Sequence, residues 1–284
     1  MRNSLICLTL ISFCLASAAQ AEGLKLCGTL RQGEILRASA GAEMQAVTIN
    51  GKPVPLAENG DFLLVLGRDE ADKVKITITD KSGKNADYVL SVAKNKWDIQ
   101  SIKGVEQRKV TPAKEDNAEI AREQTDVRRA LTTLNMQNKS WQNGFEIPLK
   151  GTISGNFGNQ RIFNGVPKSP HSGTDIAAPE GTPVKAAGDG YVVLNGSNYF
   201  YGGNMVILDH GEGLQTIYMH LKKSAVKEGE YIKKGQVVGY VGKTGRATGP
   251  HLHWGASLNN VRFRPHALTE LISAQCAVYH QNKD

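Results

Sequence analysis

Long hydrophobic runs and clustered charges are both scarce in this chain of 284 residues. After residue 21, no segment comes close to the roughly 20 consecutive apolar residues that a membrane-spanning helix needs, so no later span is expected. Lysine and arginine total 34 against 27 acidic residues, and the net charge of +7 is spread along the sequence. Such an excess suits an anionic polymer as partner, but without basic runs it does not indicate nucleic acid.

The composition excludes a wholly disordered chain and a repetitive fibre, because 40% of the residues are hydrophobic and 21% are charged. The 30 glycines, against 10 prolines, predict many turns and therefore favour β structure over helical bundles. A chain of this length is expected to form about two domains.

The first 21 residues have the pattern of a secretory signal. Arg2 is their only charge, an apolar stretch runs from Leu5 to Leu15, and small residues lead up to Ala21. The apolar stretch is too short for a spanning anchor. We therefore predict that residues 1–21 are a cleaved signal peptide and that the protein is secreted, with a periplasm as the expected destination.

Cysteine is rare, and removal of the signal would leave Cys27 and Cys276 as the two cysteines of the mature chain. In an oxidising compartment, two cysteines allow one bridge. We predict a disulfide between Cys27 and Cys276, with a pair of free thiols as the alternative.

The sequence divides into two β-rich regions. Residues 22–105 alternate with period two, as in 73–79, and dipeptides such as Asn50-Gly51 between the runs are hairpin signals. This pattern predicts a small β-sandwich. The region has no histidine and no cysteine–histidine cluster, so we expect no chemistry in it.

Residues 106–144 are predicted to be a linker with one amphipathic helix, because Ile120, Val127, Leu131 and Leu134 form a single apolar stripe. From residue 145 the β pattern returns, and residues 180–185 are repeated in part at 228–233. Duplicated hairpins of this kind predict a mainly antiparallel, barrel-like sandwich over 145–270, followed by a C-terminal tail, 271–284. The predicted fold class is mainly β.

All seven histidines lie at or after position 171. His251 and His253 are two residues apart, so in a strand they project to the same face. A strand over 214–221 would place Leu221 with Ile217 on one face, and His220 with Tyr218 on the other, more polar face, from which the histidine could reach the same cleft.

His171 and, four residues later, Asp175 add an imidazole and a carboxylate. Neutral imidazole and carboxylate have the free lone pairs that a divalent metal needs, and no cysteine is present in these segments to build a closed structural site. Three protein ligands would leave a fourth zinc position for water, which is typical of a catalytic site.

From about Ile147 to Pro265 the chain resembles the lysostaphin/LytM-type zinc peptidases. These peptidases have an HxxxD motif, a lone strand histidine and an HxH motif in this order, as do the segments His171-Ser-Gly-Thr-Asp, Tyr218-Met-His-Leu and Gly249-Pro-His-Leu-His-Trp. The resemblance does not extend to the N-terminal region.

The resemblance implies that His171, Asp175 and His253 bind one Zn²⁺ and that His251 and His220 are catalytic. It implies an endopeptidase that hydrolyses peptide bonds of bacterial peptidoglycan. In a periplasm the expected bond is the D-Ala–diaminopimelate cross-link, while a glycine bridge and carboxypeptidase trimming of the stem peptide remain open.

Two other functions fit parts of the sequence. A metal-free protein of the same fold could bind the cell wall or activate wall amidases, although the intact metal ligands argue against it. A lipoyl-like carrier would explain the repeated Glu-Gly turns at 180 and 228 but would leave the histidine segments unexplained.

Overall fold

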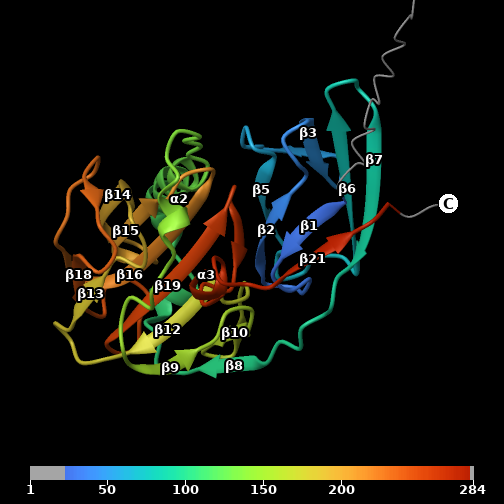
Figure 1. The fold of residues 1–284 in the computed structure, drawn as a ribbon. Coiled ribbons are helices and arrows are strands. Elements are labelled where there is room, and N and C mark those ends of the chain that lie inside the picture. The colour runs from blue at the N-terminus through green and yellow to red at the C-terminus, as the bar shows by residue number, and fades with distance from the viewer. Residues whose placement is uncertain (1–22, 282–284) are drawn as a thin grey trace, which may run out of the picture.

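The computed structural model describes residues 23–281, and the predicted signal peptide lies outside them. The predicted fold class, mainly β, is confirmed (Figure 1). Within the described residues, no helix is both long and apolar enough to cross a membrane.

The N-terminal region consists of two sheets that enclose one apolar core. The first sheet has the order β21–β1–β2–β5, with β1 (Leu24–Cys27), β2 (Ile35–Ser39), β5 (Asp61–Val65) and β21 (Cys276–Tyr279). The second has the order β4–β3–β6–β7, with β3 (Met44–Ile49), β4 (Lys52–Val54), β6 (Lys73–Asp80) and β7 (Asn85–Ser91). The strict alternation along β6 explains its packing, because Val74, Ile76 and Ile78 point into the core.

The segment that links the two regions contains β8 (Ile99–Ile102), α1 (Gln107–Val110) and α2 (Asn117–Leu131), with short 3₁₀ turns at Lys114–Asp116 and Ser140–Asn143. The apolar side of α2 packs against the C-terminal sheet through Ala130 and Leu131. The helix ends one turn earlier than the apolar stripe suggests, and Leu134 lies beyond it with 53% of its surface exposed.

The C-terminal region is built on a large, mainly antiparallel sheet with the order β17–β14–β15–β16–β19–β12–β9. Its strands are β9 (Thr152–Gly155), β12 (Gly173–Ala177), β14 (Gly190–Tyr199), β15 (Gly203–Asp209), β16 (Leu214–Ser224), β17 (Tyr231–Ile232) and β19 (His251–Leu258). β13 (Pro183–Lys185), β18 (Val237–Val241) and β20 (Val261–Phe263) pair at its side, and α3 (Ala267–Glu270) follows. Trp254, Tyr218 and Phe263 are fully buried in its core.

Pairing between strands crosses the predicted domain boundaries. β8 joins β10 (Gln160–Phe163) and β11 (Val166–Pro167) in a small sheet at the side of the C-terminal region. β21 returns to the N-terminal region and pairs with β1 (Figure 1). The domain boundaries at 105/106 and 270/271 remain predictions. Residues 276–279 of the predicted tail are a strand of the first sheet.

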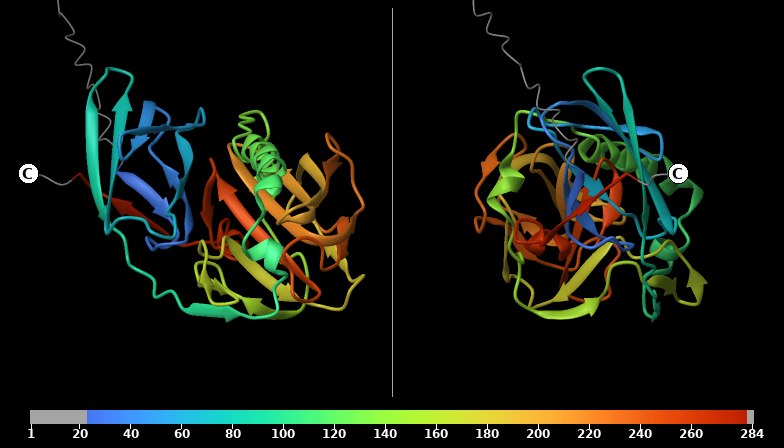
Figure 2. Two further views of the ribbon diagram at one scale, coloured as in Figure 1. Left: turned by 180° about the vertical axis from the view of Figure 1, so that it is seen from behind. Right: turned by 45° about the vertical axis from the view of Figure 1, so that its right-hand side comes forward.

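The two regions are packed against each other along β2 and β5 (Figure 2). Leu36 and Leu64 face the N-terminal core, whereas Ile35 and Leu63 on the opposite faces belong to the core of the C-terminal region. Arg264 adds a two-point ion pair with Glu34, with nitrogen–oxygen distances of 2.9 Å. Both faces of these two strands therefore contribute buried side chains.

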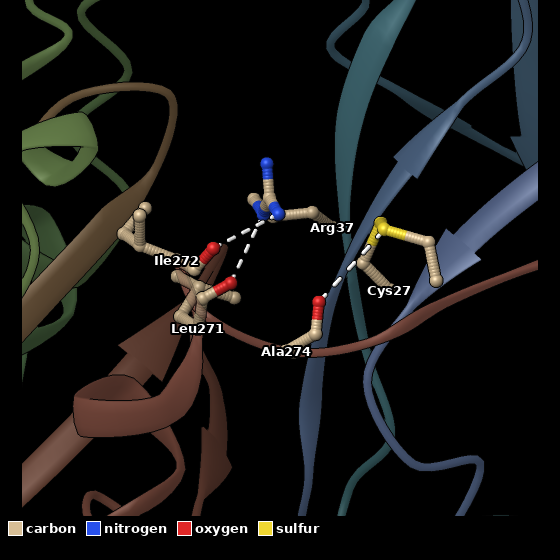
Figure 3. Close-up of a disulfide and its surroundings, with 6 residues drawn as sticks. Cys27, Arg37, Leu271, Ile272 and Ala274 are labelled. Atoms are coloured by element: carbon tan, nitrogen blue, oxygen red, sulfur yellow. Dashed lines mark hydrogen bonds between the residues drawn. A yellow bond between two sulfur atoms is a disulfide. The ribbon is translucent and has the colours of Figure 1, made fainter.

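The predicted disulfide between Cys27 and Cys276 is present, with its two residues directly opposite each other on β1 and β21 (Figure 3). Beside it, Arg37 on β2 donates hydrogen bonds to the backbone oxygens of Leu271 and Ile272 at 3.0 and 3.1 Å. The bridge and the arginine together hold the segment after α3 against the N-terminal sheet.

We predict that the double variant Cys27→Ser/Cys276→Ser has a free energy of unfolding about 2–5 kcal/mol lower than that of the oxidised protein, because the bridge restricts the unfolded chain. Urea denaturation with and without a reductant measures this difference. The reductant should lower the midpoint of the wild type and leave that of the double variant unchanged. Equal midpoints for the oxidised wild type and the double variant would contradict the prediction.

Candidate metal centre

His171, Asp175 and His253 converge at two neighbouring strands of the C-terminal sheet, β12 and β19. Asp175 on β12 lies directly opposite His253 on β19, and His171 comes from the segment just before β12. His171 Nε2, Asp175 Oδ1 and His253 Nδ1 are 2.9–3.0 Å from one another, and all three side chains are buried. The three side chains thus offer one donor atom each to a common point.

The surrounding groups orient these donors as metal ligands. The Nδ1–H of His171 donates to the backbone oxygen of Asn156 at 2.9 Å, which leaves the Nε2 lone pair facing the centre. Arg161 donates to Asp175 Oδ2 at 2.6 Å, so Oδ1 is the oxygen that faces the histidines. Donor atoms this close together need protons or a cation between them, and two imidazoles with one carboxylate are a donor set that fits a divalent metal.

The ionisation of Asp175 and His253 is also suited to metal binding. Burial disfavours charge on Asp175, but its hydrogen bonds with His171 and His253 outweigh this effect and hold the pKa of the carboxyl well below its ordinary value. Burial lowers the pKa of His253 to about 4, so its imidazole is neutral at neutral pH. Asp175 thus supplies an anionic ligand and His253 a neutral one.

His220 and His251 lie beside this centre with their rings 4.8 Å apart. The Nδ1–H of His220 donates to the backbone oxygen of Thr244 at 2.8 Å, and that of His251 to the backbone oxygen of Gly249 at 2.9 Å. In each ring this bond leaves Nε2 unused. Burial, reinforced by the neighbouring histidines, lowers the pKa of His220 to about 3, which keeps that ring neutral.

His220 reaches the centre through an irregularity in β16. Ile217 and Met219 lie on the side that α2 covers, whereas Tyr218 and Leu221 both lie in the main core. Residues three apart cannot share a face of a regular strand. His220 has a left-handed backbone (φ 63°), and the pairing with β15 shifts register nearby. Leu221 was expected to share a face with Ile217, and His220 to share a polar face with Tyr218. Both expectations are wrong. Since Tyr218 lies in the core, regular alternation would have turned His220 into the core as well.

A cleft of about 540 Å³ opens over the five residues predicted to form the site. Part of its wall comes from the linking segment, through Gln100 and Ile102 of β8 and through Val105. Two further side chains in the cleft, Arg161 and Arg246, were not identified from the sequence. Neither has a spacing that marks it, because the tertiary fold alone brings them to the histidines.

A buried His–Asp–His donor set with two more histidines in an open cleft defines a metal-dependent hydrolase domain. Residues 169–265 match peptidase family M23, and this part of the chain belongs to that family. Because M23 is a metallopeptidase family, a metal is implied at the His171–Asp175–His253 centre.

Several named relatives share this domain. The chain is 45% identical over 111 residues to the peptidoglycan DD-endopeptidase ShyA of Vibrio cholerae, covering 39% of this chain and 26% of that protein. It is 41% identical over 117 residues to the DD-carboxypeptidase/endopeptidase Mpg of Neisseria meningitidis, covering 40% and 27%. The matches span about a quarter of the length of these relatives.

The likeness to a crystal structure from Pseudomonas aeruginosa, described as a peptidase M23, extends further. It covers 86% of this chain and 96% of that one, with 29% identity and a TM-score of 0.64. The shared fold therefore includes more of the chain than the matched family segment.

We predict that Gly173→Ala weakens metal binding. A methyl group at Gly173 would fall on the backbone oxygen of Trp254 and 2.7 Å from Nε2 of His253, so it would displace the ligand ring and the paired strand. Metal titration of the purified variant should give a lower affinity, and thermal denaturation a lower midpoint. Gly67→Ala is the matched control, because its methyl group would meet a side chain at 3.4 Å in ordinary contact. Wild-type metal affinity in Gly173→Ala would contradict the prediction.

Proposed function

We propose that this protein is a secreted, zinc-dependent endopeptidase that hydrolyses peptide bonds of bacterial peptidoglycan. The observation that carries the proposal is the convergence of His171, Asp175 and His253 on one point, beside two further histidines in an open cleft. The names of the relatives, which include peptidoglycan DD-endopeptidases, support the same substrate.

Zinc is the proposed metal because two imidazoles and one carboxylate suit a tetrahedral site with an open fourth position. When bound, Zn²⁺ supplies Lewis-acid activation of a peptide carbonyl and of water. His171, Asp175 and His253 would hold it. Arg161 would keep Oδ1 of Asp175 turned toward it, as Asn156 does for Nε2 of His171.

His251 and His220 are proposed to act on protons and developing charge. Each ring is held by a hydrogen bond from Nδ1 to a backbone oxygen, so each Nε2 is free to accept a proton at the cleft. His251 Nε2 lies 3.8 Å from Asp175 Oδ1, close enough to the metal ligands to take the proton of an attacking water. His220, on the neighbouring strand, would stabilise the charge on the carbonyl oxygen once its Nε2 has taken up a proton, because only then can that nitrogen donate a hydrogen bond.

The proposed bond is the D-Ala–diaminopimelate cross-link, and the proposed location is the periplasm. The bond follows from the DD-endopeptidase relatives, and the location from the signal-like pattern of residues 1–21 and from the disulfide. The net charge of +7 suits the anionic wall polymer.

We predict that substitution separates metal ligands from proton-transferring residues. His253→Ala and Asp175→Ala should purify with little zinc and little activity. His220→Ala and His251→Ala should keep about one zinc per chain yet lose roughly 100-fold or more in turnover. Metal content by mass spectrometry and hydrolysis of purified peptidoglycan give the two readouts. If His251→Ala loses zinc while His253→Ala keeps it, the proposed roles of the pair are reversed.

Digestion of isolated diaminopimelate-type peptidoglycan should convert cross-linked muropeptide dimers to monomers that end in D-Ala. The products are identified by mass, and protein stripped of metal by a chelator is the control. Shortened monomers with intact dimers would indicate a carboxypeptidase. Intact peptidoglycan, together with protein that purifies without metal, would favour a cell-wall-binding protein.

A further inference from the structure

Arg246 lies in the cleft with its guanidinium between two aromatic rings. Its central carbon is 4.5 Å from the centre of the Tyr201 ring and 4.7 Å from that of Phe163. The backbone N–H of Arg246 also donates to the backbone oxygen of Tyr201 at 2.9 Å. Contacts on the ring faces fix the guanidinium plane but do not use its N–H groups, which remain available for a ligand.

This guanidinium has no counter-charge in the part of the chain that the structure describes. Burial lowers its pKa below the ordinary value, and no carboxylate is among the groups that influence this pKa. Among the described residues that line the cleft, Asp175 is the one carboxylate, and Arg161 already pairs with it. A partly buried cation without a partner beside a metal centre is a recognition element for an anion.

The contacts of Phe163 place Arg246 close to the reacting groups. The guanidinium of Arg246 lies over the ring of Phe163. The same ring also contacts Arg161, whose central carbon is 6.0 Å from the ring centre. Arg161 in turn bonds to the metal-ligating Asp175. Arg246 and the residue that orients the metal ligand therefore lie against the same aromatic ring.

We propose that Arg246 binds a substrate carboxylate next to the scissile bond and thereby selects the peptides that this enzyme cuts. This inference rests on the proposed function. In a D-Ala–diaminopimelate cross-link, the carbon attached to the scissile nitrogen carries a free carboxylate, whereas a glycine bridge has none at that carbon. A guanidinium can donate two parallel hydrogen bonds to the two oxygens of one carboxylate. The C-terminal carboxylate of the same peptide is a second source of this chemistry.

The test compares three cross-linked peptide dimers: one with both carboxylates free, one with a carboxamide beside the scissile nitrogen, and one with a C-terminal carboxamide. For the wild type, amidation beside the scissile nitrogen should lower kcat/KM by about 10- to 100-fold, the usual effect of a charge-assisted hydrogen bond. Arg246→Met should show this loss already on the free acid and no further loss on the amide. Lys243→Met, which removes an exposed charge from the same loop, should keep the wild-type preference.

A larger effect of the C-terminal carboxamide would overturn the assignment to the carboxylate beside the scissile bond. A preference for the free acid that survives in Arg246→Met, or an equal loss on all three dimers, would overturn the role of Arg246. Binding of dye-labelled dimers to metal-free protein, followed by fluorescence anisotropy, adds a readout that does not depend on turnover. If the wild type cleaves no dimer, the proposed function fails, while equal affinities for acid and amide would overturn the inference itself.

Discussion

The carboxylate of Asp175 sets the main constraint on this molecule, because it is ionised although only 6% of the residue is exposed. A buried charge is stable only where its partners are held in place. Those partners come from β10 through Arg161, from β19 through His253 and from the segment before β12 through His171. The register that pairs β12 with β19 and the small sheet that carries β10 are therefore as important to the centre as the ligands themselves.

The sequence revealed those parts of the centre that depend on local geometry. The two-residue spacing of His251 and His253 is meaningful in any strand, and the histidine–carboxylate pair at 171 and 175 was visible as a motif. The position of His220 was predicted for the wrong reason, because a left-handed residue in a strand interrupts the period on which the argument relied. No role was predicted for Arg246, since its aromatic neighbours come from β10 and from the turn after β14.

The fold class was predictable for a similar reason. Alternation of apolar and polar residues is a property of single strands, and it identified β6 almost residue by residue. The partners of a strand are a different matter. β8 pairs with β10 across some 60 residues, and β21 pairs with β1 across 249 residues. Neither strand has a sequence pattern that identifies its partner. Counting cysteines predicted the bridge, but not the sheet that brings its two ends together.

Strand β21 also determines when the N-terminal sheet can be completed. During synthesis β1 exists long before Cys276, and until β21 arrives its outer edge carries unpaired N–H and C=O groups. An exposed edge is a site for pairing with other chains, so the order of events matters to a cell that makes this protein. The strand that completes the first sheet is the last to be synthesised and comes from beyond the catalytic region. A premature stop codon near position 270 would therefore leave every residue of the histidine centre in place but remove β21 from the N-terminal sheet.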